Sequence, residues 1–317
     1  MYTTHRALKI PERNRNARLL VLLLACLLGG QAYAQDHGSA AEVGKKLADP
    51  LSDVWALFTE IDYTWSEGDF TDGDHETSQA IIFQPVTPVN FSENFTLISR
   101  PTLPVIINQD VPDGFRCQFQ DCIRPGGGFE PGTQVTFDDN TGLGDFILPL
   151  MLSPKKDDPT ERFGWALGPS FVFPTATDDD LGTDTWEAGI AGILTYKTPK
   201  ITALVYTQYW WSYSEQNNAE ETSHASVLWG GWYNLPDAWQ IGITPTLTYN
   251  DKADSDNAWN VPVGIMAAKT VKFGKLPVKF QFGVEKSIVR QEDFGKDWMF
   301  RFNIIPVIPA LIEGPLF

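Results

Sequence analysis

The chain lacks long apolar runs beyond its first 34 residues, and it is poor in cysteine and histidine. Only three cysteines and four histidines occur among 317 residues. No later stretch approaches the roughly 18 uninterrupted apolar residues that a membrane-spanning helix requires. If the protein crosses a membrane it must therefore use β-strands, which close into a barrel because an open edge cannot be hydrated in lipid.

Basic charge is also scarce. The chain has 24 Lys and Arg residues against 40 Asp and Glu residues, and its formal net charge is −16. Binding to nucleic acid depends on Lys and Arg side chains that neutralise phosphates. The charge balance therefore argues against a nucleic-acid partner.

The first 34 residues have the pattern of a secretory signal peptide. A basic segment precedes the apolar run Leu19–Leu28, and Ala32-Tyr33-Ala34 resembles a cleavage site. We expect 1–34 to be removed during export; lipid modification at Cys26 is the alternative interpretation. The remaining chain divides into a periplasmic lead-in (35–53), a transmembrane β-barrel (54–308) and a C-terminal tail (309–317).

The stretch Trp239–Asn250 has the clearest strand pattern. Its odd positions are aromatic at both ends and mostly aliphatic between, and its even positions are polar or glycine. A period of two predicts a strand with one apolar face. Aromatic residues at both ends of that face are typical of a strand that crosses a bilayer, where aromatic rings lie at headgroup level.

Similar segments recur along the chain and predict an all-β, antiparallel transmembrane barrel of about 12 strands, of the bacterial outer-membrane type. Long, acid-rich connections alternate with short turns, and we expect the long ones to be extracellular. The longest spans about 108–140. The predicted strands are Val54–Trp65, Ser78–Asn90, Phe95–Ile107, Gly142–Ser153, Phe163–Pro174, Trp186–Tyr196, Ile201–Tyr213, Ser223–Tyr233, Trp239–Asn250, Trp259–Val271, Val278–Val289 and Asp297–Ile308.

The same alternation assigns polar residues to the lumen. A barrel of this size is wider than side chains alone fill, so a narrow passage is expected. These side chains form either a hydrated pore wall or a plug of ion pairs, and the sequence leaves both open. They are Glu60, Asp62, Arg100, Asp145, Glu187, Gln208, Gln240, Asn260, Lys279, Gln281, Glu285 and Arg301.

Two neighbouring strands differ because their lumenal faces are apolar. An apolar wall with a few polar groups suits an aromatic or hydrophobic solute. In the alternative, the N-terminal segment or the 108–140 connection folds inward and packs there as a plug. The candidate solute-binding residues are Tyr206, Gln208, Trp210, His224, Trp232, Arg100 and Arg301.

Four segments of the chain carry a family pattern: LADPLSD at 47–53, FQPVTPVNFSENFTLISRPTLPVI at 83–106, GLGDFILPLMLSPKK at 142–156 and WALGPSFVFPTATDDDLGT at 165–183. They resemble the MetA-pathway-of-phenol-degradation family of outer-membrane transporters. The resemblance implies a barrel that moves small molecules, aromatic ones among them; no functional residue is carried over from it. The tail 309–317 and the cysteine-bearing connection depart from the family pattern.

Other polar clusters suggest less. Cys117 and Cys122 share one connection of an exported protein, so we expect a disulfide. The acid runs at 72–74, 178–180 and 251–256 lack a full calcium-loop spacing. We therefore expect solvated loops and no resident metal or cofactor.

His224 and Ser226 lie two apart on one strand face, a spacing that resembles the base and nucleophile of outer-membrane phospholipase. No orienting partner is evident in the sequence, so we do not expect an enzyme. We predict a channel or uptake protein for small molecules in the outer membrane of a Gram-negative bacterium. A phospholipase-like hydrolase and a non-conducting structural or adhesion barrel are the alternatives. The expected partners are outer-membrane lipid, lipopolysaccharide, the outer-membrane assembly machinery and a small solute.

Overall fold

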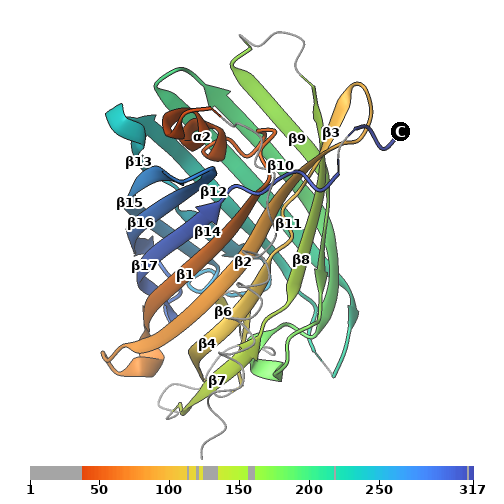
Figure 1. Ribbon diagram of the computed structural model, residues 1–317. Coiled ribbons are helices and arrows are strands. Elements are labelled where there is room, and N and C mark those ends of the chain that lie inside the picture. The colour runs from red at the N-terminus through yellow and green to blue at the C-terminus, as the bar shows by residue number, and fades with distance from the viewer. Residues whose placement is uncertain are drawn as a thin grey trace, which may run out of the picture.

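The computed structural model describes residues 38–112, 114–118, 121–123, 135–155, 161–217, 219–312 and 314–317, and these form a β-barrel (Figure 1). The predicted signal peptide lies outside them. No described helix is long and apolar enough to cross a membrane. The elements are α2 (Ala40–Leu47), β1 (Ala56–Glu67), η1 (Asp69–Thr71), β2 (Glu76–Asn90), β3 (Phe95–Ser99), β4 (Leu103–Pro112), β5 (Arg116–Gln118), β6 (Asp121–Ile123), β7 (Phe137–Leu143), β8 (Phe146–Pro154), β9 (Phe163–Phe173), η2 (Asp179–Leu181), β10 (Thr185–Lys197), β11 (Ile201–Glu215), β12 (Ser223–Asn234), η3 (Pro236–Ala238), β13 (Trp239–Ile243), β14 (Thr246–Asn250), β15 (Trp259–Phe273), β16 (Leu276–Val289) and β17 (Gly295–Pro306).

Twelve antiparallel strands form the barrel wall, which confirms the predicted fold class. β1 pairs with β2 on one side and with β17 on the other, so the sheet closes on itself. Three of the crossing strands are interrupted, and their halves are β3 with β4, β7 with β8, and β13 with β14. Pro101 and Pro245 lie at two of these breaks, where proline cannot donate to the ladder.

The two faces of the wall separate as the alternation predicts. Ile190 and Leu194 on β10 are 58% and 54% exposed, as expected of side chains that contact lipid. Nine of the polar residues assigned to the lumen are buried inside the barrel: Asp62, Asp145, Glu187, Gln240, Asn260, Lys279, Gln281, Glu285 and Arg301.

The barrel has one end with short turns and one end with longer connections (Figure 1). The C-terminal tail crosses back along the short-turn end. The backbone amides of Leu316 and Phe317 donate to the carbonyls of Asn90 and Phe91 at 2.9 and 3.1 Å. The rings of Phe91 and Phe317 meet edge to face at 5.4 Å. The tail is therefore attached to the β2–β3 turn.

The predicted 108–140 connection contains strand segments among the residues that the structure describes. β4 runs to Pro112, β7 begins at Phe137, and the short hairpin β5–β6 lies between them. Phe115 and Cys117 are buried in an apolar cluster with Phe294 from the β16–β17 connection. This hairpin therefore packs against the other connections at the long-loop end.

The β5–β6 hairpin also bears on the predicted disulfide. Its register places Cys117 opposite Cys122, and Cys117 is in the disulfide-bonded form. The Arg116 guanidinium holds the hairpin to the Asp184 carboxylate at 2.6 Å. This geometry supports the expected pairing of the two cysteines, which stays a prediction.

The lead-in contains a helix, α2, which lies in the short-turn end of the barrel (Figure 1). Ser39 and Glu42 form a capping box at its start, which satisfies backbone donors of the first turn. The Ser39 backbone amide, through its hydrogen bond, lowers the pKa of the Glu42 carboxyl. Val43 and Leu47, four residues apart, form one apolar face of this helix.

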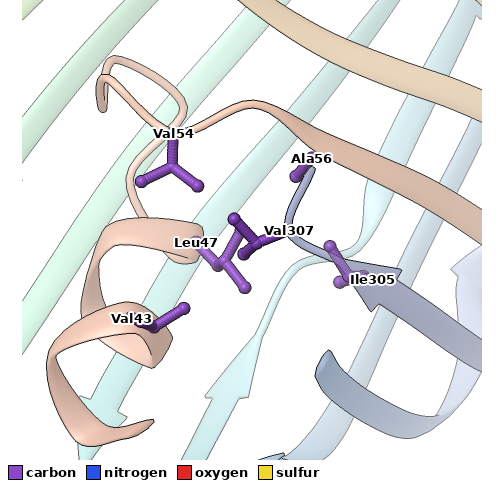
Figure 2. Close-up of a cluster of buried hydrophobic side chains, with 6 residues drawn as sticks. All are labelled: Val43, Leu47, Val54, Ala56, Ile305 and Val307. Atoms are coloured by element: carbon purple, nitrogen blue, oxygen red, sulfur yellow. The ribbon is translucent and has the colours of Figure 1, made fainter. Parts of the chain in front are cut away.

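That face packs against the end of β17. Val43 and Leu47 meet the inward side chains of Ile305 and Val307 (Figure 2). On another side of α2, a Cβ added to Gly44 would lie 2.7 Å from Thr270 Oγ1 of β15. The helix is therefore in close contact with the inner wall, and it obstructs this end of the lumen.

We expect Val43→Asp to release α2 from the barrel. The change removes about 1.5–3 kcal/mol of apolar burial and places an unpaired carboxylate in an apolar cluster. Liposome swelling with a small polar solute should be several-fold faster than for the wild type. Lys45→Ala, on the exposed face of α2, is the control and should leave the rate unchanged. Equal rates for folded Val43→Asp and wild type would show that α2 does not limit passage.

Candidate functional site

A cavity of about 190 Å³ lies in the lumen, and it brings together most of the predicted solute-binding residues. Tyr206, Trp210 and Leu228 give its wall an apolar side. Six of the seven candidates line it: Arg100, Tyr206, Gln208, Trp210, His224 and Arg301. The seventh, Trp232, does not reach this cavity.

Trp210 is fixed by hydrogen bonds and by a ring contact. Its indole Nε1 donates to Ser170 Oγ at 2.9 Å, and Ser170 Oγ lies 3.2 Å from the Gln208 amide oxygen. The His224 ring lies over the indole, with centroids 5.1 Å apart and planes inclined by 30°. The polar atom of Trp210 is thus satisfied by the wall, which holds the side chain rigidly at the edge of the cavity.

His224 has an orienting partner that the sequence analysis did not find. Its Nε2 lies 2.8 Å from Glu187 Oε2. Thr222 and Thr185 donate to the other carboxylate oxygen at 2.6 and 3.0 Å. Glu187 is on β10 and His224 is on β12. The pairing of both strands with β11 brings the two side chains together. The sequence did assign both side chains to the lumen, which is the one indication that they could meet.

The hydrolase hypothesis gains no nucleophile from this arrangement. Among the described contacts, Ser226 forms no hydrogen bond with His224, and the imidazole Nε2 is already engaged by Glu187. A serine nucleophile requires its base within hydrogen-bond distance. The contacts therefore position His224 as a polar group of the cavity wall.

A constriction marks the inner boundary of the cavity. Arg301 lies 3.1 Å from Glu60, 3.2 Å from Asp62 and 3.3 Å from Glu285. These charges come from β1, β16 and β17, so one guanidinium holds three neighbouring strands together inside the barrel. Low exposure of all four side chains strengthens each attraction relative to water.

Arg100 forms the opposite part of the constriction. Its guanidinium donates to the Gln84 amide oxygen and lies over the rings of Phe58 and Tyr206, at 5.2 and 6.0 Å from their centroids. Arg100 lies in the interruption between β3 and β4, outside both strand segments. Arginine over aromatic faces is a favourable cation–π arrangement.

A second cavity of about 90 Å³ lies beyond the constriction. Its lining shares Arg100, Tyr206 and Arg301 with the first cavity, and Leu47 to Ser52 close it at the short-turn end. Trp232 belongs here and packs with Ala48. This arrangement matches the alternative that the sequence left open, in which the N-terminal segment folds inward against the apolar lumenal strands.

The predicted acid runs do not assemble a metal site in the described residues. The described part of the chain contains one cluster whose ligand atoms lie within 4.8 Å of each other, formed by Glu67, His75 and Asp297. Arg290 lies 2.8 Å from Glu67, and Lys286 lies 2.9 Å from Asp297. Protein cations already neutralise these carboxylates, which leaves the cluster unsuited to a divalent ion.

One known protein family matches more than half of the chain. The family described as "Putative MetA-pathway of phenol degradation" matches residues 106–287. The chain belongs to this family. No curated protein sequence matches it.

Solved structures of outer-membrane proteins are similar to this chain to different degrees. The COG4313 outer membrane channel from Pseudomonas putida F1 is similar with a TM-score of 0.58 at 12% identity, over 81% of this chain and 97% of that chain. Outer membrane phospholipase A from Escherichia coli gives 0.39 at 10% identity, over 82% and 98%. A Pseudomonas aeruginosa FadL homologue gives 0.36 at 10% identity, over 86% and 93%. The first likeness shows that this family member has the fold of an outer-membrane β-barrel.

We expect Arg301→Gln to destabilise the barrel strongly. Loss of the guanidinium leaves Glu60, Asp62 and Glu285 buried without their common cation, and breaking a buried ion pair costs about 3–5 kcal/mol. Arg290→Gln is the control, since its partly exposed pair with Glu67 contributes about 0–1 kcal/mol. Urea unfolding followed by gel mobility measures both. Equal midpoints for the two variants would contradict a stabilising role for the Arg301 cluster.

Proposed function

We propose that the barrel is an outer-membrane channel or uptake protein for small aromatic or hydrophobic molecules. The observation that carries the proposal is the wall of the larger cavity. It presents the apolar surfaces of Tyr206, Trp210 and Leu228 beside the polar groups of Gln208 and His224. Pockets that bind small apolar ligands typically combine such a surface with a few polar groups that fix orientation.

The size of the cavity limits the solute. A volume of about 190 Å³ suits a solute with a single aromatic ring and is too small for a solute made of several linked rings or units. Arg100, which already lies over two aromatic rings, can offer the same cationic contact to an aromatic solute. Hydroxyl or carboxylate substituents on that solute would find donors in Arg100 and Gln208.

Two features bear on passage through the lumen. The Arg301 constriction separates the two cavities, and residues 47–52 with α2 obstruct the short-turn end. A solute that enters at the long-loop end therefore meets the larger cavity first. Transport along the barrel axis requires displacement of the N-terminal segment, so the resting barrel is a closed form of the channel.

The proposal includes export and insertion into the outer membrane. The signal peptide 1–34 directs export, and the outer-membrane assembly machinery inserts the barrel. Long acid-rich connections face outward near lipopolysaccharide, where divalent cations bridge acid groups and phosphates. A structural or adhesion role would leave the aromatic cavity wall without a purpose.

We expect Trp210→Ala to lower uptake of phenol selectively. An aromatic contact contributes about 0.5–1.5 kcal/mol, which corresponds to a roughly 2- to 10-fold loss. Uptake of glycerol should stay the same. Trp211→Ala, whose side chain points to lipid and is 46% exposed, is the matched control. A rise for both solutes, or no change in either, would argue against recognition of aromatic solutes by this wall.

A further inference from the structure

Arg100 differs from Arg301, the other cation of the constriction, because it has no carboxylate partner. Its Nη2 atom donates to the Gln84 amide oxygen, which is the one hydrogen bond of this guanidinium among the described residues. The Nε atom is buried and has no hydrogen-bond partner. The three acids of the constriction pair with Arg301, and no described acid forms an ion pair with Arg100. A guanidinium has five N–H donors, so most of those on Arg100 are available.

The surroundings of Arg100 do not compensate its charge. The side chain lines both lumenal cavities, and its guanidinium lies over the rings of Phe58 and Tyr206. Aromatic faces attract a cation, but they do not accept its N–H groups in pairs as a carboxylate does. A charge that is removed from water without an opposite charge is unfavourable. An anionic group on a solute would therefore be stabilised beside Arg100.

The lining of the larger cavity carries more positive than negative charge. Three cations line it, Arg100, Lys296 and Arg301, together with two acids, Glu60 and Asp62. The whole chain, by contrast, has a formal net charge of −16. Both acids of the lining lie close to Arg301, at 3.1 and 3.2 Å. The cavity therefore favours an anion over a cation, in a protein that is acidic overall.

The available cation lies next to the apolar wall of the same cavity. Tyr206, Gln208 and Trp210 alternate along β11, so their side chains share one face in steps of about 7 Å. Arg100 contacts Tyr206, the first of the three, with 6.0 Å between the guanidinium carbon and the ring centroid. A carboxylate bound by Arg100 would therefore place an attached ring along the face between Tyr206 and Trp210. One short molecule can meet the cation and the aromatic surface together.

We propose that the barrel selects aromatic carboxylates, with Arg100 as the residue that binds their carboxylate group. The inference rests on the proposed uptake of small aromatic molecules and narrows it to one chemical class. Benzoate is the simplest member of that class. Its carboxylate accepts from the free N–H groups of Arg100, and its ring lies against Tyr206 and Trp210. Benzyl alcohol, a neutral molecule of similar size, keeps the ring contacts and loses the charge-assisted hydrogen bonds.

Two variants test Arg100 by different routes. Arg100→Gln removes the cation. Gln84→Glu keeps the cation and replaces the amide that accepts from it with a carboxylate, which then competes with the solute; this variant also serves if Arg100→Gln does not fold. Arg290→Gln is the matched control, because Arg290 is outside the linings of both cavities. Isothermal titration calorimetry of the purified protein in a non-ionic detergent measures the affinities for benzoate and benzyl alcohol at neutral pH, with detergent alone as the blank.

We expect the wild type and Arg290→Gln to bind benzoate roughly tenfold more tightly than benzyl alcohol, as one charge-assisted interaction provides. Arg100→Gln and Gln84→Glu should bind the two ligands with equal affinity. Equal affinities in the wild type, or a preference for benzoate that persists in either folded variant, would overturn the selection of carboxylates by Arg100 and leave the proposed function standing. Binding of neither ligand by the wild type would overturn the proposed function and the selectivity together.

Discussion

The need to pair every backbone amide and carbonyl in lipid governs this structure. It excludes open edges, which is why β1 pairs with both β2 and β17 and the sheet closes. Closure then divides each strand into a lipid-facing row and a lumenal row, and the lumenal row can contain charges that lipid would not accept. The Arg301 cluster is a product of this division, since its acids come from β1 and β16, which flank the β17 strand of Arg301 only in the closed barrel.

The candidate functional site lies beside two places where backbone pairing in the barrel wall is interrupted. The interruption at Arg100 turns a guanidinium into the lumen, and the interruption at Pro245 leaves the β15 side of the wall unpaired. Both are costly in a membrane unless the structure gains something in return. The cavity with Trp210 and His224 is next to both breaks, which connects irregular backbone with a wall suited to an aromatic solute.

Much of the fold could be predicted from the sequence because a period of two is a local signal. The twelve crossing strands and the inward positions of Glu187 and Arg301 follow from it directly. The contacts between those residues could not be predicted, since they depend on strand register and on side-chain reach across several strands. For the same reason, the sequence did not identify Glu187 as the partner of His224.

Other differences have identifiable local causes. No helix was predicted in the lead-in, although Ser39 and Glu42 form a capping pattern and Val43 and Leu47 are spaced as one helix face. Trp239–Asn250 was predicted as one regular strand, and the alternation continues through Pro245 even though the ladder does not. Pairing partners, which a single sequence does not display, decide whether such a proline is tolerated.

The central claim is that the lumenal cavity binds a single-ring aromatic solute, and a crystal structure with para-bromophenol tests it most directly. Anomalous scattering locates the bromine without reference to weak density. The account predicts a bromine peak in the larger cavity, beside Trp210 and within reach of Arg100. A peak only on the lipid-facing surface, or no peak at saturating concentration, would contradict it.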